Sequence, residues 1–130
     1  MGIRDIAAWV GTAILSGLAL FQILLALGLP LGKAAWGGQH RILPTAWRLG
    51  SLAAVAILAV AGWILLARAG MVAPGAEPLA VRIVAWVFAA YFGLNVLMNL
   101  LSRSPIERAM MTPASALLFA SYLTVLLVRA

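Results

Sequence analysis

The 130 residues are 65% hydrophobic and only 9% charged, whereas soluble domains average about 25% charged residues. Small proteins have a large surface relative to their volume, so a water-soluble fold of this length cannot bury so much apolar area. The composition therefore excludes a water-soluble fold. The net charge of +6 comes from nine basic residues near the ends of apolar runs, so we expect no nucleic-acid partner. With no cysteine, one histidine and three acidic residues, the chain predicts no disulfide, no cofactor and no metal centre.

The first predicted helix covers about residues 4–30, over most of the uncharged stretch Ile6–Leu31. This stretch is much longer than the roughly 7–15-residue apolar core of a cleaved signal peptide, so we expect a retained membrane span. About 20 residues suffice to cross the hydrocarbon core of a bilayer. Gln22 places an amide in the half of this span that approaches the next loop.

The longest connection, residues 31–44, is predicted to be structured, and we call it loop one. Gly37 and Gly38 could offer backbone amides to an anion, although adjacent glycines often only bend the chain. His40 is the only histidine. Beside Arg41 at a membrane interface, it fits a headgroup or backbone hydrogen-bond partner as well as a functional group.

Three further spans are predicted at about residues 45–69, 78–102 and 105–129. Proline suits the first position of a helix or the one before it, and Pro44 and Pro78 stand where the second and third spans begin. A turn of sequence Ala73-Pro74-Gly75-Ala76-Glu77, which we call loop two, precedes the third span. Gly70 is predicted to close the second span in a left-handed conformation.

The fourth span begins with Ser104-Pro105-Ile106-Glu107, which predicts a capping box. In this motif the Ser104 side chain accepts from the Glu107 amide, while the Glu107 carboxylate accepts from the Ser104 amide. The motif follows the third span after a few residues, here called loop three, so the third and fourth spans form a tight hairpin. It gives Glu107 a structural role, and we do not expect it to be catalytic.

These spans predict an all-α polytopic membrane protein, a single domain over residues 1–130 with four transmembrane helices in an up-down antiparallel bundle. Loops one and three then share one membrane face. That face carries Lys33, Arg41, Arg48, Arg103 and Arg108, and the other carries Arg4, Arg68, Arg82 and Arg129. Five against four is almost no bias. The small excess favours cytoplasmic loops one and three, and the near balance also permits an antiparallel homodimer.

Small residues recur at every fourth position in the third span, at Ala85, Ala89 and Gly93. Such a stripe lets two helices approach closely. It is a candidate face for contact with a second copy.

Polar side chains inside a membrane are costly enough to mark packing contacts or function. In the third span they recur at every fourth residue and so form one stripe toward the loop-one face. Together with polar groups of the first span and loop one, they predict a vestibule for a ligand or a permeating solute. The predicted vestibule residues are Gln22, Gln39, His40, Arg41, Tyr91, Asn95, Asn99 and Arg103. The alternative is that the amides only join helices, at about 0.6 kcal/mol each.

The run Leu29-Pro30-Leu31-Gly32-Lys33-Ala34-Ala35-Trp36-Gly37-Gly38-Gln39-His40-Arg41, followed by Leu43-Pro44, resembles a segment of small bacterial four-span membrane proteins. Their loop has the pattern P-L-G-x-A-A-W-G-G-x-H-R. The stretch Asn95–Pro113, with Ser102, Ser104, Glu107 and Met111, is similar to the second characteristic segment of that group. The two segments cover about a quarter of the chain. The resemblance implies a multi-pass protein of the bacterial inner membrane and no particular activity.

Three functions remain open from the sequence. A passive channel or small-solute transporter would use the amide-lined vestibule for a neutral solute, or for a small anion attracted by the basic residues at its rim, because the uncharged middle of each span holds no acidic or basic residue. An accessory or scaffold subunit would instead pack its helices on a membrane partner. A lipid-processing enzyme fits least, because Asp5, Glu77 and Glu107 lie at helix ends without an acid–base partner. We therefore expect no catalytic residues, and we expect lipids and a possible second copy as partners.

Overall fold

The computed structural model describes residues 1–73 and 75–128, and in them the chain forms four long helices and no strand. They are α1 (Ile3–Ala26), α2 (Thr45–Arg68), α3 (Leu79–Leu100) and α4 (Pro105–Leu127). Each is long and apolar enough to cross a membrane, which confirms the all-α four-span fold. Pro74 of the predicted turn and Arg129 of the basic set lie outside the described residues.

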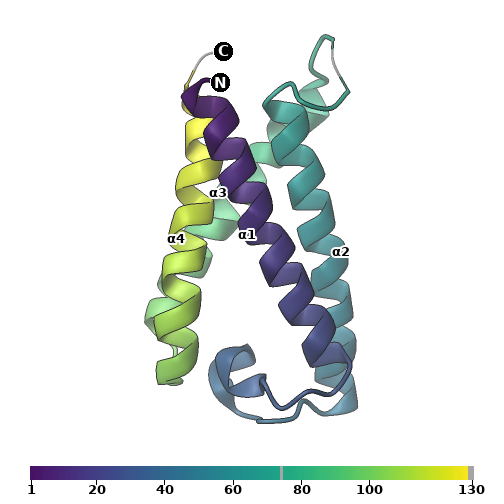
Figure 1. Ribbon diagram of the computed structural model, residues 1–130, viewed down its shortest axis with the longest axis vertical. Coiled ribbons are helices and arrows are strands. Elements are labelled where there is room, and N and C mark those ends of the chain that lie inside the picture. The colour runs from purple at the N-terminus through teal and green to yellow at the C-terminus, as the bar shows by residue number, and fades with distance from the viewer. Residues whose placement is uncertain (74, 129–130) are drawn as a thin grey trace.

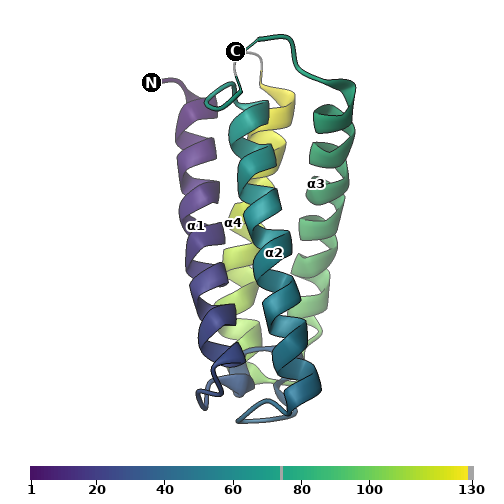
Figure 2. The ribbon, with the colours of Figure 1, turned by 90° about the vertical axis from the view of Figure 1, so that its right-hand side faces the viewer.

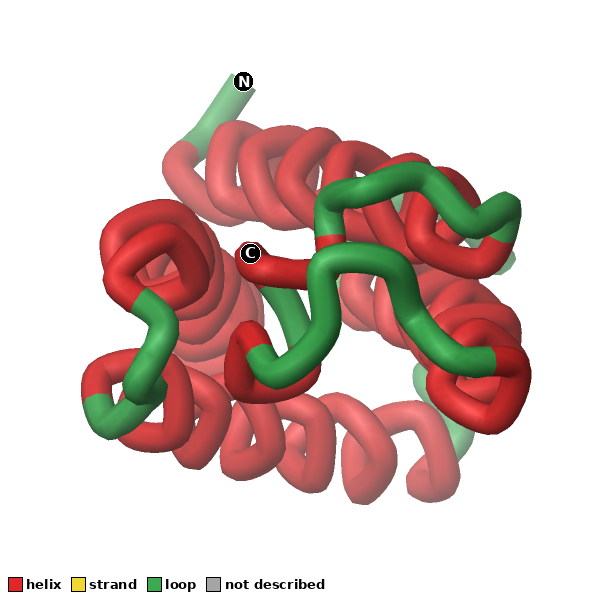
Figure 3. Tube along the Cα trace, turned by 90° about the horizontal axis from the view of Figure 1, so that it is seen from below, coloured by secondary structure: helices red, strands yellow, loops and turns green. Residues whose placement is uncertain are grey.

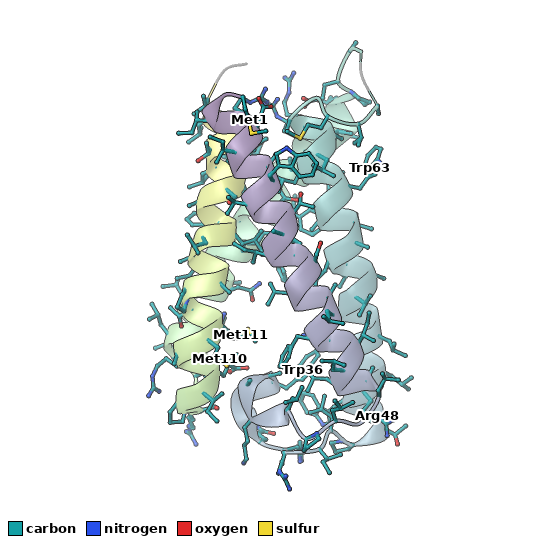
Figure 4. All side chains as sticks on the ribbon, viewed as in Figure 1. Met1, Trp36, Arg48, Trp63, Met110 and Met111 are labelled. Atoms are coloured by element: carbon teal, nitrogen blue, oxygen red, sulfur yellow. The ribbon has the colours of Figure 1, made fainter. Side chains whose placement is uncertain are left out.

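The helices run alternately up and down (Figures 1 and 2). The start of α1, loop two and the end of α4 lie at one end of the bundle, which we call the terminal end. Loops one and three lie together at the other end, the loop-one end. Trp63 lies near the terminal end and Trp36 at the loop-one end (Figure 4). Both loops therefore lie on one face of the membrane if the helices span it.

Two helices end in glycine caps of the same kind. Helix α1 stops at Ala26, earlier than the predicted end near residue 30, because Gly28 adopts φ +88° and turns the chain. The Gly28 and Leu29 amides then donate to helix carbonyls at 3.0 and 3.2 Å. Gly70, with φ +79°, closes α2 by the same pattern, as its position after the second span predicts.

The main core lies toward the terminal end, where α1, α2 and α4 approach closely. Gly11 of α1 makes this approach possible, because a Cβ atom there would stand 2.6 Å from a Leu65 methyl group and 3.1 Å from Ser121 Cβ. Phe92 of α3 and Tyr122 of α4 are fully buried in the same core, with ring centroids 5.3 Å apart. This half of the bundle is tightly packed.

The stripe of small residues in α3 faces the inside of the bundle. Ala85 and Ala89 are 0% and 2% exposed, and a Cβ atom on Gly93 would meet the Phe119 ring of α4 at 3.0 Å. The idea that this stripe contacts a second copy is therefore wrong. Close approach of α3 to α4 within one chain already uses the small side chains.

Toward the loop-one end, α1 diverges from α4 and stays beside α2 (Figure 1). Loop one crosses beneath the helices at this end, from α1 toward α4 and back to α2 (Figures 1 and 3). It contains two short 3-10 turns, η1 (Gly32–Ala34) and η2 (Trp36–Gly38). The loop therefore forms a floor under the part of the bundle where the helices separate.

Loop one is held closed by its own contacts. The Gly32 amide donates to the Arg41 carbonyl at 2.8 Å, and a Cβ atom on Gly32 would collide with the His40 carbonyl oxygen. Leu25 of α1 packs with Ala35 and Leu43 in a small core of the loop's own. Only glycine at position 32 permits this closure, so loop one is an ordered element.

Candidate functional site: a cavity above loop one

A cavity of about 220 Å³ lies above loop one and is lined by all four helices. Trp36 of loop one lies beneath the space between α4 and α1, and Met111 lies on its α4 side (Figure 4). Other residues of the wall include Gln22 on α1, Asn95 on α3 and Glu107 on α4. The cavity is a result of the uneven packing, because it occupies the end of the bundle where α1 leaves α4.

Four of the eight predicted vestibule residues line this cavity: Gln22, Tyr91, Asn95 and Asn99. They come from two helices that are not neighbours in the sequence, so helix packing alone brings them together. The side-chain amides of Gln22, Asn95 and Asn99 therefore line the same cavity.

The structure does not bring the other four predicted residues to the cavity. Gln39 and Arg41 are exposed, and the His40 ring lies 6.2 Å from the Trp47 ring, between centroids. The bond between Gly32 and Arg41 closes loop one and leaves this segment on its outer side. Arg103 lines a separate open hollow outside the bundle, beside the backbone of loop one.

The amides of the cavity serve two different purposes. Asn99 donates from its amide nitrogen to the Met111 carbonyl at 3.2 Å and to the Ser115 hydroxyl at 3.1 Å, so it joins α3 to α4. Gln22 Oε1, in contrast, is a buried oxygen without a hydrogen-bond partner. Asn95 makes no side-chain hydrogen bond within residues 1–73 and 75–128. Asn99 therefore fits the helix-joining interpretation. The polar side-chain atoms of Gln22 and Asn95 are not used by other described side chains or backbone groups.

Glu107 is the largest departure from the sequence interpretation. Half of the predicted capping box forms, since the Glu107 amide donates to Ser104 Oγ at 3.3 Å. The other half does not, because the Ser104 amide donates to Ser102 Oγ at 3.2 Å instead. The Glu107 carboxylate turns to the cavity, where it accepts from the Ser102 hydroxyl at 2.5 Å and from the Gly37 amide at 3.3 Å. The cavity therefore has an acidic group in its wall, a residue that the sequence interpretation assigned only to the helix cap.

Gly37 and Gly38 connect loop one to loop three and do not offer an anion site. The Gly37 amide is used by Glu107, and the Gly38 amide donates to the Ala35 carbonyl at 2.8 Å. The Ser104 hydroxyl donates to the Lys33 carbonyl and completes the junction. The proposed anion-binding turn is wrong, because protein acceptors already occupy both amides.

Trp36 forms part of the cavity floor in a strained conformation. Its φ of +52° is unusual for a bulky side chain. The indole nitrogen donates to the buried Ser51 hydroxyl at 3.1 Å, and the ring meets Trp47 edge-on with centroids 5.4 Å apart. Strain of this kind gathers at functional sites, where surrounding contacts maintain it.

The cavity does not continue to the terminal end. Beyond it lie the Phe92 and Tyr122 rings and the Phe88 ring stacked on Phe92 at 5.9 Å. The Tyr122 hydroxyl donates to the Ala61 carbonyl of α2 at 2.5 Å, so the barrier bridges two helices. The arrangement is a vestibule that is closed on one side by the core.

Comparison of the chain with models of protein families, with curated proteins and with solved structures found no match. In the described part of the chain, no three His, Cys, Asp or Glu side chains gather in a way that could hold a metal ion. The interpretation of the cavity therefore depends on its own chemistry.

Proposed function

We propose that the protein binds a small solute in the cavity above loop one and lets it cross the membrane, as a passive channel or a small-solute transporter. The setting that we propose is the bacterial inner membrane, and the protein acts without catalysing a reaction. The main observation behind the proposal is the buried side-chain oxygen of Gln22, which has no hydrogen-bond partner. A buried polar atom without a partner costs about 1–3 kcal/mol, and a bound solute or water in the cavity removes that cost.

The size of the cavity limits the solute. Sites for drug-sized ligands measure about 300–1,000 Å³, and this cavity of about 220 Å³ is smaller. A solute of a few heavy atoms fits, and its polar groups can meet Gln22 and Asn95. The closed core above the cavity supports a binding step before passage.

The test is solute flux into vesicles that contain the purified protein, followed by light scattering as the vesicles swell. Two alanines of α4 give a matched pair, because Ala114 lines the cavity and Ala116 is exposed on the outside of the bundle. We expect flux above that of empty vesicles, a several-fold loss in Ala114→Leu, and no loss in Ala116→Leu. If no small neutral or charged solute exceeds the leakage of empty vesicles, the proposal is wrong.

A further inference from the structure

The Glu107 carboxylate is buried in the wall of the cavity without a positive partner. Glu107 is only 8% exposed, and none of the described basic side chains forms an ion pair with its carboxylate. Two basic side chains at the loop-one end bind backbone carbonyls instead: Lys33 of loop one donates to Gly38 at 3.1 Å, and Arg108 of α4 donates to Ser102 at 2.8 Å. A charge buried in this way is costly unless a cation pairs with it.

The carboxylate keeps room for a ligand. Oε1 accepts one bond from Ser102 and Oε2 accepts one from Gly37, whereas an ionised carboxylate has about four acceptor positions. These two bonds hold the group in place and leave acceptor capacity on both oxygens. The site is therefore pre-formed for a donor.

The side-chain amides of the cavity supply further acceptors beside the carboxylate. Gln22 Oε1 is unpartnered, and Asn99 uses its amide nitrogen on α4, which leaves its carbonyl oxygen without a donor among the described residues. The rings of Trp36, Tyr91 and Phe92 also line the cavity. Aromatic faces attract cations, so they favour the same kind of ligand as the carboxylate.

We infer that the solute is a small organic cation whose head group donates hydrogen bonds, such as an amidinium or a primary ammonium, and that Glu107 binds it. This inference rests on the proposed function and names its substrate class. It replaces the expectation of a neutral solute or an anion, because that expectation depended on a vestibule without an acidic group. The basic residues of loops one and three remain outside the cavity.

Acetamidinium, acetamide and acetate test the inference, because the three molecules have nearly the same shape and differ in charge. Acetamidinium is a cation, acetamide is neutral and acetate is an anion. Uptake is measured in vesicles with the wild-type protein, with the membrane potential clamped by potassium and valinomycin. We expect acetamidinium to enter about tenfold or more faster than acetamide, and acetate to stay at the level of empty vesicles. Faster entry of acetamide or acetate would overturn the inference without any variant.

Glu107→Gln then tests the residue, and Glu77→Gln is the matched control. Glu77 lies at the terminal end, where it pairs with Arg68 at 3.0 Å, and it does not line the cavity. We expect Glu107→Gln to lose the preference for acetamidinium and to keep acetamide uptake. Glu107→Asp, which retains the charge, and Glu77→Gln should keep the preference. A Glu107→Gln protein that is folded and still prefers acetamidinium contradicts the assignment.

Binding measured by calorimetry on protein in lipid nanodiscs separates this inference from the proposed function. If acetamidinium binds the wild type and not Glu107→Gln, but nothing crosses the vesicle membrane, the cation site stands and transport is wrong. If acetamide crosses equally with both proteins and acetamidinium neither binds nor crosses, transport stands and the cation site is wrong.

Discussion

The junction between loop one and loop three can be tested with two adjacent glycines. Gly37 and Gly38 adopt φ of +76° and +72°, a conformation that costs an L-residue about 1–2 kcal/mol. They differ in their surroundings. A Cβ atom on Gly37 meets nothing within 4 Å, whereas one on Gly38 would collide with Ser104 Cβ and stand 3.0 Å from the Lys33 carbonyl oxygen.

The expected effects follow from this difference. Gly37→Ala should lower the free energy of unfolding by the backbone cost alone, about 1–2 kcal/mol. Gly38→Ala adds the cost of overpacking against Ser104, which is only 8% exposed and cannot turn away, typically about 1–3 kcal/mol more. The total for Gly38→Ala is then about 2–5 kcal/mol.

Unfolding of the two variants in detergent, by heat or by added dodecyl sulfate, measures the difference in stability. Limited trypsin digestion shows whether the loss of stability lies in loop one, because trypsin cleaves after Lys and Arg and loop one contains Lys33 and Arg41. We expect Gly38→Ala to be cut in loop one faster than Gly37→Ala and the wild type. Equal destabilisation of the two variants, with equal cleavage of loop one, would refute the docking of loop one on Ser104.

Three further changes test the packing, each by the free energy of unfolding in detergent. Asn99→Leu should cost about 1 kcal/mol, since it removes the bonds that join α3 to α4; no loss would contradict that role. Tyr122→Phe should cost about 0.5–1.5 kcal/mol for the lost bond to α2, and an unchanged stability would show that the bond does not form. Gly11→Val should cost about 1–3 kcal/mol by collision with Leu65, whereas Gly17→Val, with nothing within 4 Å, should cost less than half of that.

The fold was predictable because the bilayer imposes it. Four uncharged stretches of sufficient length define four helices, and glycine in the right place predicts where α2 ends. The early end of α1 was not predicted, because the apolar run continues past Gly28 into loop one and hydropathy does not distinguish the two. The packing of Ala85 was also missed, since a stripe of small residues fits a contact within one chain as well as one between chains.

The site was predictable only in its helical part. Fourfold spacing places Tyr91, Asn95 and Asn99 on one face of a helix, and a single amide in the first span could be matched to that face. The roles of Glu107 and Trp36 depend on the docking of loop one against loop three, a contact between segments about 70 residues apart. No local pattern encodes such a contact, and the capping motif at Ser104 offered a sufficient local explanation for Glu107.

The uneven packing of the bundle also constrains how a solute could cross by the proposed route. Helices α1 and α2 form one pair, α3 and α4 form the other, and the pairs meet most closely in the terminal half. The bond from Tyr122 to the Ala61 carbonyl crosses from one pair to the other, directly above the cavity. A solute that leaves toward the terminal end must therefore separate the two pairs at their best-packed region. Movement of the pairs relative to each other is consequently a better route than a fixed pore.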